Sequence, residues 1–194
     1  GPDNQFRPET PEFKKWFGDS KVVDADGKPL VVYHGTDEQF TEFKPEGMGS
    51  WFAENRDVSA EYGEGRMVEA YIKAGNPIEV PYETIDLSQD AKAIDALGEL
   101  NRANGTDITP KEIGFSDDYV GMAFEYFGLN EKFISAARRR GFDSIHAYEM
   151  GESTWNVFEP TQIKSATDNN GDFDGSNPNI NRRPETSPTS GQDT

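Results

Sequence analysis

The stretch Val31–Thr36, which reads VVYHGT, predicts a short apolar strand that ends in a polar His-Gly-Thr motif. Gly49–Ala53, which reads GSWFA, predicts a second strand. A helix is expected to follow it, with Asp57 as its cap and with Ser59 and Tyr62 presented by it. A histidine, a glycine backbone and two aromatic rings would suit a flat heteroaromatic ligand with ribose hydroxyls. NAD is such a ligand.

The composition favours one acidic domain with some unfolded length. Of 194 residues, 34% are hydrophobic, and 19 basic against 36 acidic residues give a net charge of -17. This charge repels phosphate backbones, so a general nucleic-acid-binding role is disfavoured. The absence of cysteine excludes disulfides and a cysteine nucleophile. No apolar run approaches the roughly 20 residues of a membrane span, no signal peptide is visible, and Gly1-Pro2 resembles a tag-cleavage scar.

The order of the expected elements predicts an α+β domain over residues 11–166. Strands come first, helices occupy a helical insertion at about 85–130, and two strands return near the end of the domain. The sheet is therefore expected to be largely antiparallel. His146 falls within one of the late strands, where a structural role is expected.

The composition changes after Ala166. Residues 167–194 are rich in Asp, Asn, Gly, Ser, Pro and Thr, so we expect a disordered acidic and polar tail. Within it, Asn170–Gly175 has the start of a calcium-loop pattern, but the twelfth position is Asn181 instead of Glu. No metal site is predicted.

The order of these motifs resembles the ADP-ribosyltransferase superfamily. The chain shows strand-His-Gly-Thr, then Gly-x-Trp-Phe-Ala, then Ser-Ala-x-Tyr, and a late strand that ends Val-Phe-x-Pro-x-Gln-Ile. Within the superfamily it is similar to the diphtheria-toxin and PARP branch, whose signature is His, Tyr and Glu on three core strands. A narrower resemblance, through Phe13–Ser20 and Val157–Ala166, is to ADP-ribosyltransferase-like domains of phage and mobile-element polyvalent proteins. The resemblance implies a split antiparallel sheet with flanking helices.

The resemblance also implies a site for NAD as the substrate, without a metal. His34 would hydrogen-bond a ribose hydroxyl, and the backbone of Gly35, which Thr36 follows in the motif, would take the nicotinamide carboxamide. Ser59 could donate to the same amide, and Tyr62 would stack on the nicotinamide. The alternative is structural: His34 bonded to backbone at the end of a strand, and Tyr62 packed without a ligand.

Two positions depart from the family pattern. Trp51 stands where PARPs have the second-motif Tyr, so the phenol hydroxyl is lost. The third-motif Glu falls on Thr154, which cannot supply a carboxylate charge. If the strand extends to Glu152, that side chain shares a face with Thr154 and is the best candidate for the catalytic group. Glu149, on the preceding loop, is a second candidate.

The resemblance therefore implies a mono-ADP-ribosyltransferase, with Glu152, His34 and Tyr62 as catalytic residues, acting as a phage-borne or toxin-type effector. The expected partner is a macromolecular acceptor, protein rather than nucleic acid because of the acidic charge. The expected site of action is the cytoplasm of a bacterial or target cell. Two alternatives stay open: a catalytically weak or inactive NAD-fold module of a larger polyprotein, and an NAD glycohydrolase.

Overall fold

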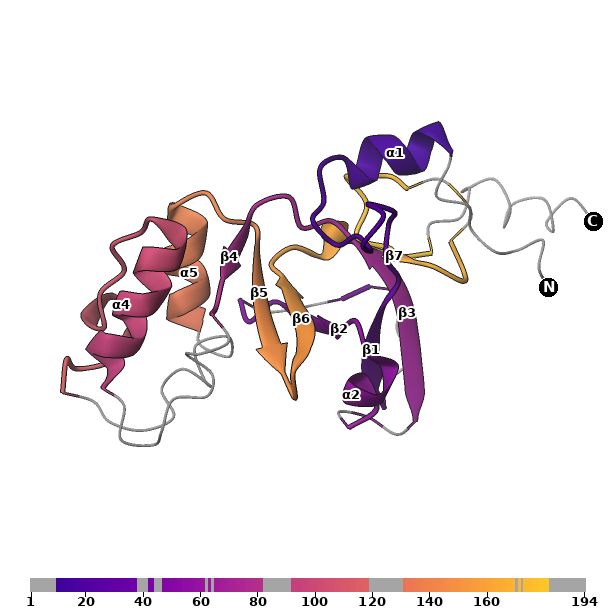
Figure 1. Cartoon of the computed structure of the whole chain (residues 1–194). Coiled ribbons are helices and arrows are strands. Elements are labelled where there is room, and N and C mark those ends of the chain that lie inside the picture. The colour runs from indigo at the N-terminus through magenta and orange to yellow at the C-terminus, as the bar shows by residue number, and fades with distance from the viewer. Residues whose placement is uncertain are drawn as a thin grey trace, which may run out of the picture.

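A seven-stranded mixed sheet organises the computed structural model, which describes residues 10–37, 42–43, 47–61, 63, 65–81, 92–118, 131–169, 171 and 173–181. In spatial order the strands are β4 (Pro77–Glu79), β5 (Ser144–Glu149), β6 (Glu152–Val157), β2 (Ser50–Ala53), β1 (Val32–Thr36), β3 (Arg66–Ile72) and β7 (Ile163–Ser165) (Figure 1). β4 and β5 pair in parallel, and the other neighbours pair antiparallel. The predicted α+β class is confirmed.

The sheet is split between β1 and β2. These two strands pair through a single residue pair, Tyr33 with Ala53. By contrast, β2 and β6 pair through four residue pairs, and β1 and β3 through five. The sheet therefore consists of two well-paired halves, β4-β5-β6-β2 and β1-β3-β7, that meet at a narrow joint, as the resemblance implied.

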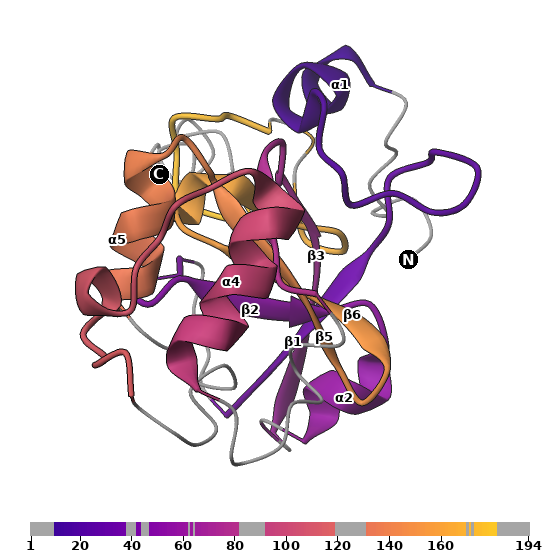
Figure 2. The ribbon, with the colours of Figure 1, turned by 60° about the vertical axis from the view of Figure 1, so that its left-hand side comes forward.

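Two helices cover one face of the first half-sheet. In Figure 2, α4 (Ala93–Asn104) and α5 (Glu131–Arg139) lie in front of the strands. α5 buries Phe133, Ile134 and Ala137 against Ile145 of β5, and its last turn carries Arg138 and Arg139, where cations favour the helix dipole. α4 and the short helix η2 (Lys111–Ile113) fall within the predicted insertion. The parts of the insertion at 85–91 and 119–130 lie outside the described residues.

The N-terminal helix and the start of the predicted tail pack on the second half-sheet. Thr10 caps α1 (Pro11–Phe17), which buries Phe13 against Tyr71 of β3. Phe173 also packs on Phe13, with ring centroids 5.1 Å apart. Ile180 is buried, and its carbonyl accepts from the Ser165 amide at 3.0 Å. The described residues between 167 and 181 thus pack on the domain where the sequence predicted disorder, and buried Phe173 and Ile180 help to anchor them. Residues 170, 172 and 182–194 lie outside the described part.

An ion cluster fastens α5 to the insertion. Arg140 donates from both terminal nitrogens to the two carboxylate oxygens of Glu112, at 2.7 and 2.8 Å, and Arg139 adds a bond of 2.9 Å. These guanidinium groups lower the pKa of Glu112 from 4.5 to about 2. The carboxylate therefore stabilises the folded state over the whole neutral range.

We expect Glu112→Gln to lower the free energy of unfolding at neutral pH by about 1–2 kcal/mol. Because the folded-state pKa is depressed, this contribution is present above pH 4.5 and is lost as the pH falls toward 2. Urea unfolding of both proteins across this range should show the difference shrinking. Asp107→Asn is the matched control, since its side chain contacts the same Arg140 but is 93% exposed. An equal effect of both substitutions would contradict the assignment.

Candidate functional site

His34 spans the joint between the two half-sheets. Its Nδ1 lies 2.7 Å from the carbonyl oxygen of Trp51, and its ring contacts Phe43 and Phe52 at centroid distances of 5.0 and 5.4 Å. A carbonyl only accepts, so Nδ1 carries the proton and Nε2 has the lone pair in the neutral ring. Burial lowers the pKa of His34, and the bond to Trp51 opposes this only in part. The imidazole is therefore neutral at pH 7.

Helix α2 (Arg56–Ala60) lies directly against β1. A Cβ atom added to Gly35 would come 2.1 Å from the Ser59 carbonyl oxygen, so glycine is required here by the approach of the helix. The buried Ser59 hydroxyl donates to the Tyr33 carbonyl at 2.6 Å. If Ser59 donates to a ligand amide, as predicted, its hydroxyl must first give up the hydrogen bond to the Tyr33 carbonyl.

The third predicted ligand-binding segment is only partly described. Gly63 packs so closely against Thr36 that a Cβ atom added to Gly63 would lie 2.6 Å from the Thr36 amide nitrogen. Tyr62 lies outside the described residues. Its predicted stacking on nicotinamide therefore stays a prediction.

The register of β2 and β6 places Trp51 and Thr154 on one face. Ala53 pairs with Thr154 and Trp51 with Asn156, so the side chains of Trp51 and Thr154 point to the same side. The Trp51 ring packs against the α4 and α5 cluster, whereas the His34 ring contacts Phe52 on the other side. The rings of Trp51 and His34 thus lie on different sides, and His34 contacts Trp51 through the carbonyl oxygen of Trp51.

β6 extends to Glu152, as the candidate role of this residue requires. Glu152 begins the strand, shares the face of Thr154 and is exposed, whereas Thr154 is 5% exposed. Glu149 pairs with Glu152 across the hairpin, whose turn has positive φ at Met150 and Gly151. The structure therefore offers two carboxylates at the end of the hairpin and none at position 154.

One residue that the sequence reasoning missed links Glu152 to the helix. Asn55, not Asp57, caps α2, and its Oδ1 accepts from the Asp57 amide at 2.9 Å. The predicted cap was wrong by two residues. The Nδ2 of Asn55 lies 3.4 Å from Glu152 Oε1. The cap thus places the carboxylate beside the start of the helix that carries Ser59.

The described residues contain neither a metal-ligating cluster nor a membrane-spanning helix. Among them, no group of three or more His, Asp or Glu side chains is arranged to hold a metal ion. No helix in the same part of the chain is long and apolar enough to cross a membrane.

The split sheet, with a His-Gly strand at its joint and a serine-bearing helix against that strand, defines an ADP-ribosyltransferase-like class of protein. A family model described as ADP-ribosyltransferase in polyvalent proteins matches residues 24–173, and the chain belongs to this family. The resemblance drawn from the motifs is thereby confirmed.

Two further comparisons add little. No curated protein matches the chain significantly. A solved structure described as an anti-CRISPR protein is 18% identical, covers 69% of this chain and 91% of its own, and has a TM-score of 0.37. At that TM-score the likeness carries no argument.

The contact between Gly35 and α2 leads to a stability prediction. We expect Gly35→Ala to lower the free energy of unfolding by about 2–3 kcal/mol, because the clash is with backbone that cannot rotate away. Gly98→Ala is the control: it lies in α4, its nearest neighbour is a flexible arginine atom at 3.5 Å, and it should stabilise by about 0.5–1 kcal/mol. Chemical unfolding measures both, and equal signs would contradict the prediction.

Proposed function

We propose that this protein is a mono-ADP-ribosyltransferase that uses NAD as its substrate and modifies a macromolecular acceptor, most favourably a protein. The observation that carries the proposal is the extension of β6 to Glu152, which supplies a carboxylate on the face of Thr154, beside the capped end of α2. We further propose that it acts in the cytoplasm of a bacterial or target cell, as a phage-borne or toxin-type effector.

The residues support the chemistry in distinct ways. Cleavage of the nicotinamide–ribose bond develops positive charge on the ribose, as in glycoside hydrolysis, and a nearby carboxylate stabilises that charge. Glu152 is assigned this role. The neutral imidazole of His34 presents Nε2 as an acceptor for a ribose hydroxyl. The Gly35 backbone would bond the carboxamide, and Tyr62 would stack on the leaving ring.

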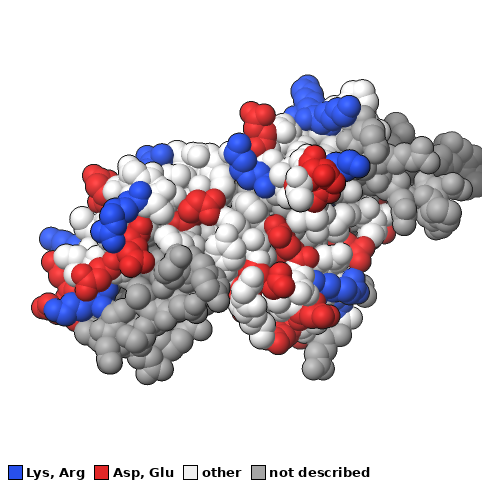
Figure 3. Space-filling view, in the orientation of Figure 1, with Lys and Arg blue, Asp and Glu red and all other residues white. Residues whose placement is uncertain are grey.

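The charge of the molecule supports a protein acceptor with a basic surface. The net charge is -17, and Asp and Glu side chains gather near α2 on the face shown in Figure 3. Exposed acidic residues in this region include Asp57, Glu61 and Glu152. A surface of this sign attracts Lys- and Arg-rich proteins and repels phosphate backbones.

One observation favours a second function, a catalytically weak or inactive NAD-fold module used for interaction in a larger polyprotein. Thr154, at the position of the family Glu, pairs with Ala53 on one side and Ala147 on the other. The neighbours of Thr154 in the sheet are thus apolar, and threonine, which stands in place of the family Glu, carries no charge. An NAD glycohydrolase would use the same residues with water as the acceptor.

The decisive experiment compares two carboxylates of one hairpin. Tagged NAD is incubated with the protein and a cell lysate, and labelled proteins, RNA and DNA are identified by mass spectrometry. We expect protein labelling, and a fall of about 10²-fold or more with Glu152→Ala, since the charge stabilising the transition state is removed. Glu149→Ala, on the paired position of β5, is the matched control and should retain most activity.

The other outcomes discriminate between the alternatives. Release of free ADP-ribose without labelling identifies a glycohydrolase. Absence of any turnover, with NAD binding retained, identifies the inactive module. Loss of activity in Glu149→Ala but not in Glu152→Ala would move the catalytic role to Glu149.

The pKa of His34 predicts how NAD binding depends on pH. Because burial lowers this pKa below 6.5, Nε2 stays an acceptor at pH 6.5 and affinity should fall only in more acidic solution. Calorimetric titration of NAD into Glu152→Ala, which prevents turnover, measures this. Adding His34→Gln should weaken binding and remove the pH dependence, whereas adding His146→Gln, at the second histidine of the chain, should not. An unchanged profile with His34→Gln would place NAD elsewhere.

A further inference from the structure

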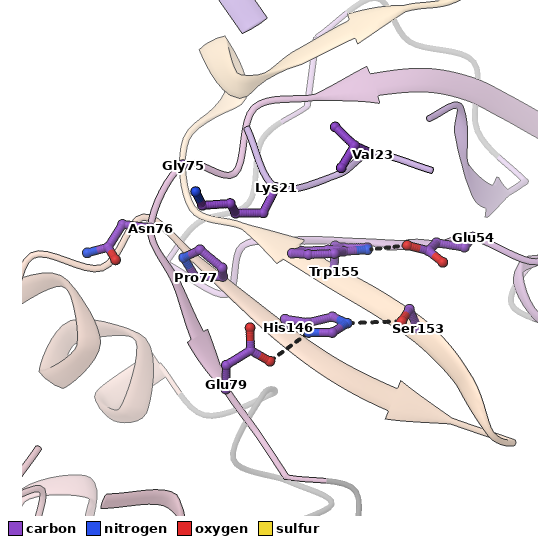
Figure 4. A pocket seen from close by; sticks show the side chains of 10 residues that line it. All are labelled: Lys21, Val23, Glu54, Gly75, Asn76, Pro77, Glu79, His146, Ser153 and Trp155. Atoms are coloured by element: carbon purple, nitrogen blue, oxygen red, sulfur yellow. Dashed lines mark hydrogen bonds and ion pairs between the residues drawn. The ribbon is translucent and has the colours of Figure 1, made fainter. Parts of the chain in front are cut away.

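An open, shallow pocket of about 540 Å³ lies on the sheet face opposite Thr154. Ser153 and Trp155 alternate with Thr154 along β6, so their side chains point to the other side of the sheet. Figure 4 shows these two side chains beside His146 of β5 and Glu79 of β4. None of these four residues belongs to the NAD half-site.

Three of these side chains form a continuous hydrogen-bonded chain. His146 Nδ1 lies 2.6 Å from Glu79 Oε2, and His146 Nε2 lies 3.0 Å from Ser153 Oγ. An ionised carboxylate only accepts, so Nδ1 carries the proton of the neutral ring. Nε2 is then the acceptor, and the Ser153 hydroxyl donates to it. This is the direction that general-base activation of a serine requires.

The imidazole is held firmly in this orientation. The His146 ring stacks on the Trp155 indole, with centroids 4.1 Å apart and planes inclined by 19°. The indole is itself fixed, because its Nε1 donates to Glu54 Oε1 at 3.1 Å. The ring is thus held by two hydrogen bonds and one stacking contact.

We propose that Glu79, His146 and Ser153 form a second reactive site, in which His146 acts as general base for nucleophilic attack by Ser153 on acyl esters. Ser153 Oγ bonds to the acyl carbon while its proton passes to His146 Nε2. The ester C–O bond then breaks, and the leaving alcohol takes the proton from His146. Water, deprotonated by the same nitrogen, hydrolyses the acyl-serine and returns the site to its starting state.

The lining of the pocket fits this class of substrate. Val23 and Pro77 provide apolar surface for an acyl group. Lys21 brings a cation, and no ion pair joins it to the described carboxylates. The carboxylates of Glu79 and Glu54 are each hydrogen-bonded to a ring nitrogen. The ammonium group of Lys21 would therefore attract a carbonyl oxygen or an anionic substituent of the substrate.

The test uses a fluorophosphonate probe, which reacts with an activated serine by forming an O–P bond and releasing fluoride. The full chain is labelled without NAD, and the modified peptide is identified by mass spectrometry. We expect one adduct, on Ser153, and a rate that falls about 10²-fold with His146→Gln. Glu79→Gln, which keeps the shape but removes the carboxylate, should also slow labelling. Hydrolysis of p-nitrophenyl acetate should fall in parallel.

Two controls separate activation from accessibility and from the proposed NAD chemistry. Ser176 is an exposed serine whose hydroxyl donates to Asp174 at 2.6 Å without an imidazole, so Ser176→Ala should leave labelling unchanged. Labelling is measured without NAD, so its rate does not depend on the proposed transferase reaction. The absence of an adduct on Ser153 in the wild type overturns the proposal, and so does equal labelling of the wild type and the two variants of His146 and Glu79.

Discussion

The hydrogen bond from His34 to the Trp51 carbonyl is the contact on which the arrangement of the site depends. Backbone pairing between β1 and β2 is reduced to Tyr33 and Ala53, so the strands separate beyond that pair. Where the backbone ladder ends, the His34 side chain donates a hydrogen bond to the Trp51 carbonyl. Beyond this pair, a side-chain donor joins the two strands in place of a backbone ladder.

The same joint explains why the helix after β2 lies so close to β1. With no Cβ on Gly35, the Ser59 carbonyl approaches the strand, and the Ser59 hydroxyl bonds the Tyr33 carbonyl in return. Ser59 of the helix therefore contacts both Gly35 and Tyr33 of the strand. Gly35, which the resemblance assigns to ligand binding, is thus also required by the packing of the helix. The two roles are compatible, because the helix needs the space beside the Cα atom and a ligand would bond to the peptide groups.

Local patterns predicted the strands of the site but not the contacts between distant segments. VVYHGT and GSWFA are strands because apolar residues and a terminal glycine define them locally, and the register of Ala53 with Thr154 agrees with the position given by the motif. The packing of Phe173 and Ile180 could not be predicted, because their partners lie on α1 and the sheet. The contact of His146 with Glu79 could not be predicted for the same reason, because Glu79 is 67 residues away along the chain.

The proposed catalytic carboxylate, Glu152, lies two residues from Thr154, and this position has a physical consequence. Two residues along a strand correspond to about 6–7 Å, a distance that a Glu side chain bridges only by leaning along the strand. Thr154 is buried, whereas Glu152 is exposed, so water screens the Glu152 charge more strongly. If Glu152 is the catalytic group, as proposed, its stabilisation of an oxocarbenium ion would be stronger once a bound substrate or acceptor excludes water from the end of the hairpin. Such a position would make catalysis depend on the acceptor and would limit consumption of NAD when no target is present.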